Sequence, residues 1–255
     1  MVARLSLIAL GGIPLVGSND NLADVVAEAL NSSGEILQDG DVLVIAQKIV
    51  SKIEGRIVNL EDVEASLEAI ELASSIDKDS RQVELILRES KEIVRSKLGV
   101  LIVEQNLGLV MANAGIDHSN IENRSGSENV LLLPENPDES CLNLRKNLKE
   151  MFGVSVGIII NDSVGRAWRI GTIGVASGVA GLPAVIDLRG ESDLFGRELL
   201  VSEQAVADEL ASAASLIQGQ GSEGRPVVLI RGFASKAPHQ GANALVRSRE
   251  MDMFR

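Results

Sequence analysis

The stretch that decides the fold is Val154-Ser155-Val156-Gly157-Ile158-Ile159-Ile160-Asn161-Asp162-Ser163-Val164-Gly165-Arg166-Ala167-Trp168-Arg169. Its β-branched, apolar beginning is typical of a buried strand, which we predict over Val154–Ile160. Ligand sites in α/β sheets lie beyond the carboxyl ends of strands, where Asp162 and Ser163 follow. A carboxylate beside a hydroxyl suits Mg²⁺ or Mn²⁺, and the two arginines suit phosphate. Taken alone, the stretch is equally well explained as a strand, a polar turn and solvated arginines.

The composition bounds the class of protein. The 255 residues fit one large domain or two small ones, and 45% hydrophobic residues can bury a sizeable core. A formal charge of -12 argues against nucleic acid or an anionic membrane as the main partner. No stretch approaches the roughly 18 apolar residues of a membrane span, and no signal peptide opens the chain, so we expect a cytoplasmic protein. The single cysteine, Cys141, excludes an internal disulfide and is expected to be a packing thiol.

Strand-like and helix-like segments alternate along the chain, which predicts a mixed α+β fold. We expect a single domain over 1–255, with two subdomains as an open alternative. The expected strands are Arg4–Leu10, Val42–Ile49, Gly99–Val103, Leu107–Ala112, Val154–Ile160 and Pro226–Arg231. The expected helices are Leu22–Leu30, Asp62–Ile76, Arg81–Arg95, Cys141–Phe152 and Glu203–Gln218, with Ser80 and Ser202 as N-caps and Gly219 after the last helix. Loops are expected over Ala114–Asn129, Gly171–Gly181 and Gly219–Gly224.

A second acidic segment is Ala112-Asn113-Ala114-Gly115-Ile116-Asp117-His118-Ser119-Asn120. Asp117 could give a second carboxylate to a divalent metal, and two such ions would hold a polyphosphate in line for transfer. Asn120 could hydrogen-bond phosphate or ribose. By itself an Asp-x-x-Asn pattern usually means a turn, and His118 is expected to be an exposed histidine.

Three further segments could contact a nucleotide. Lys48 and Lys52, in Gln47-Lys48-Ile49-Val50-Ser51-Lys52, point the same way on either a helix or a strand, and a solvated basic edge explains them equally well. The Gly11–Gly17 segment is no Walker A loop, because it lacks the terminal Gly-Lys-Ser/Thr. The loop Gly219–Pro226 could wrap a ligand with its backbone amides. Because neither a P-loop nor a Rossmann fingerprint occurs, a nucleotide would bind in an unusual fold.

Together these segments resemble one family, the γ-glutamyl ligases of the deazaflavin coenzyme F420. The resemblance spans nearly the whole chain. It rests on Gly12-Ile13-Pro14-Leu15, Ala46–Lys52, Ala112–Asn120, Asn161–Arg169, Asp187-Leu188-Arg189-Gly190, Asp193-Leu194-Phe195-Gly196-Arg197 and Ala207–Ala211. Three departures remove no needed charge: Ser163 stands where the family commonly has Thr, Ala167 where it often has Pro, and Asn161 where it often has Ser or Thr. The C-terminal nitroreductase-like domain of some relatives is not expected here.

The resemblance implies a GTP-dependent ligase that joins L-glutamate to the coenzyme precursor and then adds further γ-linked glutamates. It implies two divalent ions, Mg²⁺ or Mn²⁺, together with K⁺, and an unusual fold of mixed sheets flanked by helices that forms a homodimer. The implied metal positions are Asp117, Asp162, Ser163 and Gly221, and the implied catalytic residues are Asp117, Asp162, Arg166 and Arg169. The implied nucleotide contacts are Ile13, Pro14, Leu15, Val16, Gln47, Lys48, Lys52, Asn120, Gly219, Gln220, Gly221, Ser222, Glu223, Gly224, Arg225 and Pro226.

Other roles stay open. Arg189, Arg197 and Arg231 are candidates for anionic groups of the substrate, although structural salt bridges explain each of them at least as well. Trp168 is expected to pin its loop to the core rather than to flank the coenzyme ring. Two alternative functions are a ligase of the same fold that acts on another carboxylate, and a nucleotide-binding sensor without turnover. The number of glutamates added, the preferred metal and the choice of GTP over ATP do not follow from the sequence.

Overall fold

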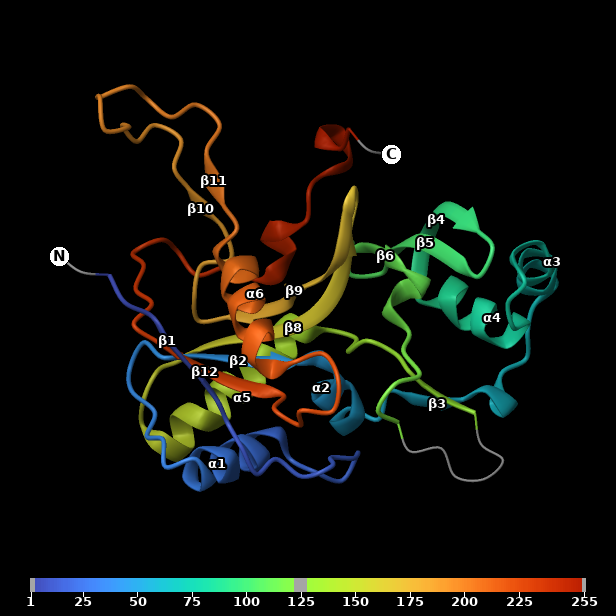
Figure 1. The fold of residues 1–255 in the computed structure, drawn as a ribbon, viewed down its shortest axis with the longest axis horizontal. Coiled ribbons are helices and arrows are strands. Elements are labelled where there is room, and N and C mark those ends of the chain that lie inside the picture. Colours follow the sequence, from blue (N-terminus) through green and yellow to red (C-terminus); the bar gives the residue numbers. More distant parts are fainter. Residues whose placement is uncertain (1–2, 122–127, 254–255) are drawn as a thin grey trace.

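A five-stranded mixed sheet forms the centre of the molecule in the computed structural model, which describes residues 3–121 and 128–253 (Figure 1). Its strand order is β1-β12-β2-β8-β9, with β2 and β8 parallel and the other neighbours antiparallel. These strands are β1 (Ser6–Ala9), β2 (Val42–Ala46), β8 (Gly157–Arg166), β9 (Arg169–Ala180) and β12 (Val227–Arg231). The predicted mixed α+β class is therefore confirmed.

Helices cover both faces of this sheet. Leu43 and Ile45 of β2 point to the face covered by α1 (Leu22–Ser32) and α5 (Pro137–Phe152). The alternate residues Val42 and Val44 point to the opposite face, which α6 (Val206–Gln218) covers. Because β2 is buried on both faces, its sequence is a continuous apolar run rather than an alternating one. Cys141 lies on the buried face of α5 and packs in the core, as predicted.

A smaller lobe lies beside the sheet (Figure 1). It consists of α3 (Leu67–Ile76) and α4 (Ser80–Arg88) packed on an antiparallel sheet of β4 (Ser90–Lys97), β5 (Val100–Gln105) and β6 (Val110–Ala112). The strand pair β3 (Ile57–Asn59) and β7 (Asn129–Leu131), with its own small apolar cluster, joins this lobe to α2 (Gln47–Ile53) of the main body. The main body and the lobe thus have separate cores.

An extended arm leaves the opposite side of the sheet (Figure 1). Its base is the two-stranded pair of β10 (Ile186–Asp187) and β11 (Glu203–Gln204). Among the described residues, no helix has the length and apolarity needed to cross a membrane.

The expected strands near Arg4–Leu10, Gly99–Val103, Leu107–Ala112 and Pro226–Arg231 are present, with shifted ends, and so is the helix at Leu22–Leu30. Three expected segments change type along their length. The strand expected over Val42–Ile49 ends at Ala46, and helix α2 begins at the next residue. The helix expected over Arg81–Arg95 ends at Arg88, and its second half is strand β4, whose side chains alternate in exposure. The start of the helix expected over Glu203–Gln218 is strand β11.

The loop expected over Gly171–Gly181 is the larger error, because all of these residues except Gly181 belong to strand β9. Two of its glycines are required by close packing. A Cβ at Gly174 would lie 2.4 Å from the carbonyl oxygen of Ala211, and one at Gly178 would lie 2.5 Å from that of Pro137. The glycines therefore let α6 and α5 approach the strand, rather than breaking it.

The ends of several strands and helices also differ from expectation. The strand expected over Val154–Ile160 begins at Gly157 and continues to Arg166. The helices expected from Asp62 and Cys141 begin at Leu67 and Pro137. Asp79, rather than Ser80, caps α4, and Ala205, which makes no side-chain cap, replaces Ser202 before α6. Gly219 ends α6 as predicted, with a φ of 81°.

Candidate active site

Two parallel strands bring the first polar residues together. Ala46, the last residue of β2, pairs with Asn161 of β8, so Gln47 and Asp162 follow at the same edge of the sheet. Helix α2 starts there and buries Gln47 and Ser51, while Lys48 and Lys52 remain partly accessible on the adjacent face. The ambiguous lysine pair thus lies on a helix, one turn apart.

Asp162 is a half-buried carboxylate on β8. Its Oδ1 accepts the backbone N–H of Ser163 at 2.8 Å, and the side chain of Gln47 also donates to it. Gln47 is held in this orientation because its Oε1 accepts the hydroxyl of the buried Ser51 at 2.9 Å. Burial raises the pKa of Asp162 to about 6, and the nearby Asp117 adds to the increase, while Ser163, Lys48 and Gln47 oppose it. Burial, with a smaller contribution from Asp117, therefore disfavours the charged form of Asp162.

Asp117 reaches the site from the other side. Its backbone pairs with Leu131, donating to the carbonyl of Leu131 at 3.0 Å and accepting its N–H at 2.8 Å. Its side chain forms an ion pair with Lys48 and accepts the N–H of Ser119 at 2.7 Å. Burial opposes ionisation of Asp117, but the hydrogen bonds from Lys48 and Ser119 prevail and lower its pKa.

An unusual backbone presents Asp117. Asn113, Ala114 and Gly115 have consecutive positive φ values of 51°, 54° and 72°. A Cβ at Gly115 would lie 2.9 Å from the side chain of Leu133, so this position requires glycine. Left-handed non-glycine residues are strained, and such strain is concentrated at functional sites.

The two lysines complete the cluster. Lys48 also donates to the hydroxyl of Ser119 at 2.5 Å, and Lys52 donates to the carbonyl of Asn120 at 2.6 Å. Burial, followed by repulsion from Lys48, lowers the pKa of Lys52. Two ammonium groups in each other's field form a natural place for an anion.

The cluster fits a metal–nucleotide complex better than a resident metal ion. Within residues 3–121 and 128–253, no three or more His, Cys, Asp or Glu side chains gather closely enough to hold an ion. Mg²⁺ is usually bound by one or two carboxylates together with phosphate oxygens and water. Asp162, Asp117 and the hydroxyl of Ser163 are the oxygen donors that could take part in such a complex.

The loop Gly219–Pro226 has both of its ends at this site. The buried side chains of Gln218 and Asn161 bond each other at 2.8 and 3.2 Å, and Gln218 also donates to the carbonyl of Pro226 at 3.3 Å. That carbonyl accepts the N–H of Ala46, next to Gln47. Within the loop, the N–H of Gly221 donates to the carboxylate of Glu223 at 2.8 Å.

The remaining predicted residues lie on other parts of the chain. Arg166 and Arg169 are exposed partners at the tip of the β8–β9 hairpin. Arg166 lies four residues beyond Asp162, or roughly 13 Å in a strand. The segment Ile13–Val16 precedes α1; Ile13 and Val16 pack on the core, whereas Leu15 is 98% exposed.

Several expectations are resolved by contacts. Arg189 is paired with Asp187 and Glu203, and Arg231 is paired with Asp41 and Glu35, so both are structural salt bridges. Trp168 is 82% exposed, so the expectation that it pins its loop to the core is wrong. His118 is exposed, as predicted.

Two site residues were missed by sequence reasoning. Ser119 follows Asp117 by two residues, and an Asp-x-Ser spacing is a signal for the side-chain-to-backbone turn that the structure shows. Ser51 gave no such signal, because a buried serine on a short helix is recognised only once Gln47 is placed.

Comparison with known proteins identifies a matching family and close relatives. The model of the F420-0:gamma-glutamyl ligase family matches residues 12–232. The chain is 46% identical to the coenzyme F420:L-glutamate ligase of Methanothermobacter thermautotrophicus, over 98% of this chain and 99% of the relative. It is 43% identical to the protein of that name from Methanocaldococcus jannaschii, over 94% and 92% of the two chains, and 39% identical to that from Archaeoglobus fulgidus, over 99% and 97%.

Proposed function

The chain belongs to the F420-0:gamma-glutamyl ligase family, and we propose that it joins L-glutamate to the coenzyme precursor F420-0 in a GTP-dependent reaction. The observation that supports this function best is the convergence of Asp117, Asp162, Lys48 and Lys52 from three separate segments. Two carboxylates and two ammonium groups form a site suited to the phosphates of a metal-bound nucleotide.

The proposed reaction has two steps. A carboxylate oxygen of F420-0 takes the γ-phosphoryl group of GTP, so that an acyl phosphate forms and GDP leaves. The amine of glutamate then attacks the acyl carbon, the carbon–oxygen bond to phosphate breaks, and the amide forms with release of inorganic phosphate and a proton. Repetition on the γ-carboxylate of the added glutamate would extend the chain. No protein nucleophile is needed.

The residues of the cluster have distinct roles in this proposal. Asp117, Asp162 and Ser163, with the backbone of Gly221, would hold Mg²⁺ or Mn²⁺. When bound, such ions neutralise the charge that gathers in phosphoryl transfer. Lys48 and Lys52 would bind phosphate oxygens, exchanging their present contacts with Asp117 and Asn120. The loop Gly219–Pro226 and the segment Ile13–Val16 would enclose the nucleotide, and K⁺ stays a prediction without an assigned site.

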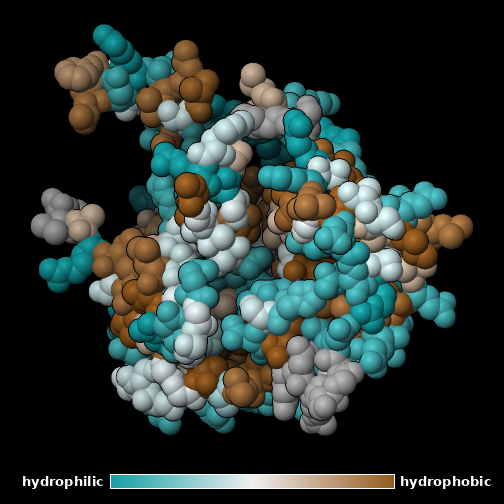
Figure 2. All heavy atoms as spheres, turned by 45° about the vertical axis from the view of Figure 1, so that its right-hand side comes forward, coloured by the Kyte–Doolittle hydropathy of each residue, from teal (hydrophilic) through white to brown (hydrophobic). Residues whose placement is uncertain are grey.

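We also propose that the protein is a homodimer. Four large apolar side chains are exposed along the β10–β11 arm: Leu194, Phe195, Leu200 and Val201 are 100%, 90%, 73% and 84% exposed. Figure 2 shows apolar surface on this projecting arm. Several exposed apolar side chains on one projecting segment favour an interaction site, and a second copy of the chain is the partner that the resemblance implies.

Incubation of the protein with F420-0, L-glutamate, GTP and Mn²⁺ tests the proposed reaction. We expect release of GDP and phosphate and a mass gain of one glutamyl unit on the precursor. Phosphate release with another carboxylate, but not with F420-0, would favour a ligase of different substrate. Nucleotide binding without phosphate release under all these conditions would favour a sensor.

A further inference from the structure

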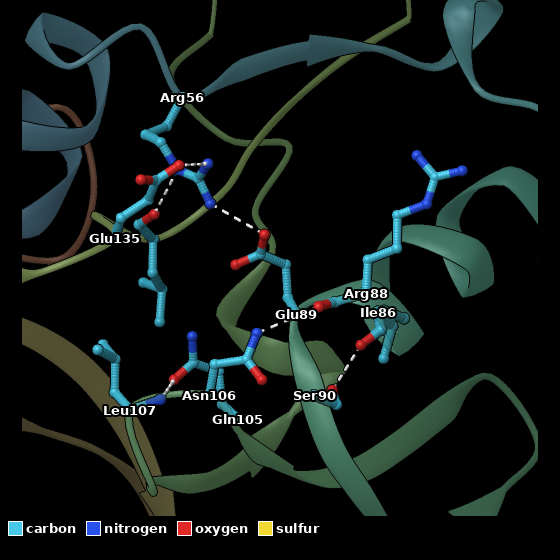
Figure 3. A network of polar contacts seen from close by, with 10 residues as sticks. Arg56, Ile86, Arg88, Glu89, Ser90, Gln105, Asn106, Leu107 and Glu135 are labelled. Carbon is cyan, nitrogen blue, oxygen red and sulfur yellow. Dashed lines mark hydrogen bonds and ion pairs between the residues drawn. The ribbon is translucent and has the colours of Figure 1, made fainter.

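Arg56 is a nearly buried arginine that no part of the proposed reaction uses. It follows Gly55, where the chain leaves α2 with a positive φ of 70°, and its side chain is only 17% exposed. Figure 3 shows its guanidinium group between Glu135 and Glu89. It donates to Glu135 at 2.8 Å and to Glu89 at 2.9 Å, and its Nε donates to the carbonyl of Leu133 at 2.9 Å.

The backbone of Arg56 makes two further bonds between the same segments. Its N–H donates to the carbonyl of Ser51 on α2 at 2.9 Å, and its carbonyl accepts the N–H of Leu132 at 3.1 Å. The backbone of Arg56 therefore bonds to Leu132, and its side chain bonds to the next residue, Leu133. This double attachment fixes the end of α2 against the segment that follows β7.

The segment held by Arg56 is the one that presents Asp117. Leu131, next to Leu132, makes both backbone bonds to Asp117. Leu133 occupies the space beside Gly115, where no Cβ fits. Lys48, which pairs with Asp117, lies on α2, the helix to which the backbone of Arg56 is bonded through Ser51. Arg56 thus links α2, which carries Lys48, to the Leu131–Leu133 backbone, which holds Asp117. The distance between these two segments determines whether Lys48 and Asp117 can pair.

The third partner ties the small lobe into this arrangement. Glu89 is the C-cap residue that follows α4. Its side chain is 18% exposed, and its carbonyl accepts the N–H of Asn106 at 3.0 Å (Figure 3). Asn106 also donates from its side chain to the carbonyl of Arg88 at 3.1 Å. The bond from Arg56 to Glu89 therefore reaches a point at which α4 and the β5–β6 turn are already joined.

We infer that Arg56 is a positioning residue, which sets the geometry of the Lys48–Asp117 pair by holding α2, the Leu131–Leu133 backbone and the small lobe together. This inference rests on the proposed function, because it takes that pair as part of the metal–nucleotide site. Arg56 itself touches neither carboxylate of the site. Its three donor directions lie in one plane, so lysine, with a single ammonium group, cannot replace all of them.

The test compares Arg56→Gln and Arg56→Lys with Arg231→Gln. Arg231 makes the same kind of contacts, to Asp41 and to the carbonyl of Ile36, but at the end of β2 away from α2. Each protein is titrated with Mn²⁺ in the presence of GDP, and bound Mn²⁺ is followed by electron paramagnetic resonance. Unfolding midpoints and the KM for F420-0 are measured in parallel.

We expect Arg56→Gln to weaken Mn²⁺ binding by about tenfold to a hundredfold, as is usual when a residue that supports a metal ligand is lost. Arg56→Lys should give a smaller loss. Arg231→Gln should lower the unfolding midpoint without changing Mn²⁺ affinity, and the KM for F420-0 should stay within about twofold of wild type in all three.

Three results would overturn the inference. They are unchanged Mn²⁺ affinity in Arg56→Gln, an equal loss in Arg231→Gln, and a wild-type protein that binds no Mn²⁺ with GDP. If Arg56→Gln does not fold, Arg56→Lys and Glu89→Gln decide by the same titration, since Glu89→Gln leaves the bond to Leu133 available. Wild-type protein that binds Mn²⁺ and GDP but forms no glutamyl product would reject the proposed reaction while leaving this inference standing.

Discussion

The edge of the sheet at α2 and the β10–β11 arm both carry sequence that resembles the ligase family, yet they differ in what surrounds them. At α2, every predicted polar residue from Gln47 to Lys52 has a partner within the same chain. On the arm, Leu194 and Phe195 point almost entirely into solvent. One chain is therefore enough to assemble the carboxylate–lysine cluster. The arm instead exposes large apolar side chains, which is why we propose that it contacts a second copy of the chain.

The largest effect is expected from Asp162→Asn, which tests whether the α2 edge performs the chemistry. Loss of a metal-binding carboxylate should remove several kcal/mol of stabilisation from the transition state, which is about a thousandfold or more in kcat. The fold should persist, because burial already disfavours the charged form of this side chain. Steady-state ligation and thermal unfolding are measured together, and near-normal turnover in a folded variant would contradict the role assigned to Asp162.

The arm is tested by the double variant Leu194→Ser and Phe195→Ser. An apolar anchor at the centre of an interface contributes about 2 kcal/mol, so the loss of both should raise the dimer dissociation constant by roughly a thousandfold. Analytical ultracentrifugation across a concentration series gives this constant directly. Leu67→Ser, at a side chain 80% exposed on α3, is the matched control and should leave self-association unchanged. A wild-type chain that stays monomeric, or a double variant that dimerises as before, would reject the arm as the interface.

Lys48→Met tests the anion-binding half of the α2 edge. A charge-assisted hydrogen bond to phosphate contributes about 1.5–3 kcal/mol, so the KM for GTP should rise by roughly tenfold to a hundredfold. Lys146→Met, on the exposed side of α5, is a suitable control for the loss of one positive charge. The KM for GTP is measured from initial rates of phosphate release. An unchanged KM in Lys48→Met would mean that Lys48 does not bind phosphate and serves only as the ion-pair partner of Asp117.

The same comparison explains which parts of the fold the sequence could predict. Strands β2 and β12 were recognisable because both of their faces are buried, so their residues form continuous apolar runs. Strand β9 was missed, since Gly174 and Gly178 are selected by the helices that pack on them and not by the strand itself. Strand β4 was missed because its Lys91, Glu92 and Arg95 give no apolar signal, and only its pairing with β5 makes it a strand.

For the candidate site, the short segments that resemble the family supplied candidate residues, whereas the residues that support them are far apart in the sequence. Asp117 and Asp162 stand in segments that carry the resemblance to the ligase family, so both could be proposed as site residues, although each segment alone fits a polar turn. Arg56, Glu89 and Leu133 are up to 77 residues apart, and nothing in the local pattern around any of them indicates the others. Supporting contacts of this kind depend on how separate elements dock, which a single sequence does not display.

The smallest expected effect is on the stability of the fold in acid. It compares Glu84, a carboxylate packed in the small lobe, with Asp187, an exposed carboxylate on the arm. Hydrogen bonds from Ser66 and Arg88 lower the pKa of Glu84 to about 2, and those from Arg189 lower the pKa of Asp187 on the arm to about 2 as well. The side chain of Glu84 is only 12% exposed, whereas that of Asp187 is 52% exposed. Similar pKa values should therefore have different consequences, because solvent screens the exposed pair.

A lowered pKa means that the folded protein binds fewer protons than the unfolded chain, so the stabilisation is present above the unfolded pKa of Glu84, near 4.5, and is lost as the pH falls toward 2. We expect Glu84→Gln to lower the free energy of unfolding at pH 7 by roughly 2 kcal/mol, the size of a charge-assisted hydrogen bond. It should also flatten the dependence of stability on pH between about 5 and 2, whereas Asp187→Asn should leave both quantities unchanged within error. Urea unfolding at a series of pH values measures this, and an equal response to the two substitutions would mean that the arm is packed as firmly as the small lobe, against the contrast drawn between the two regions.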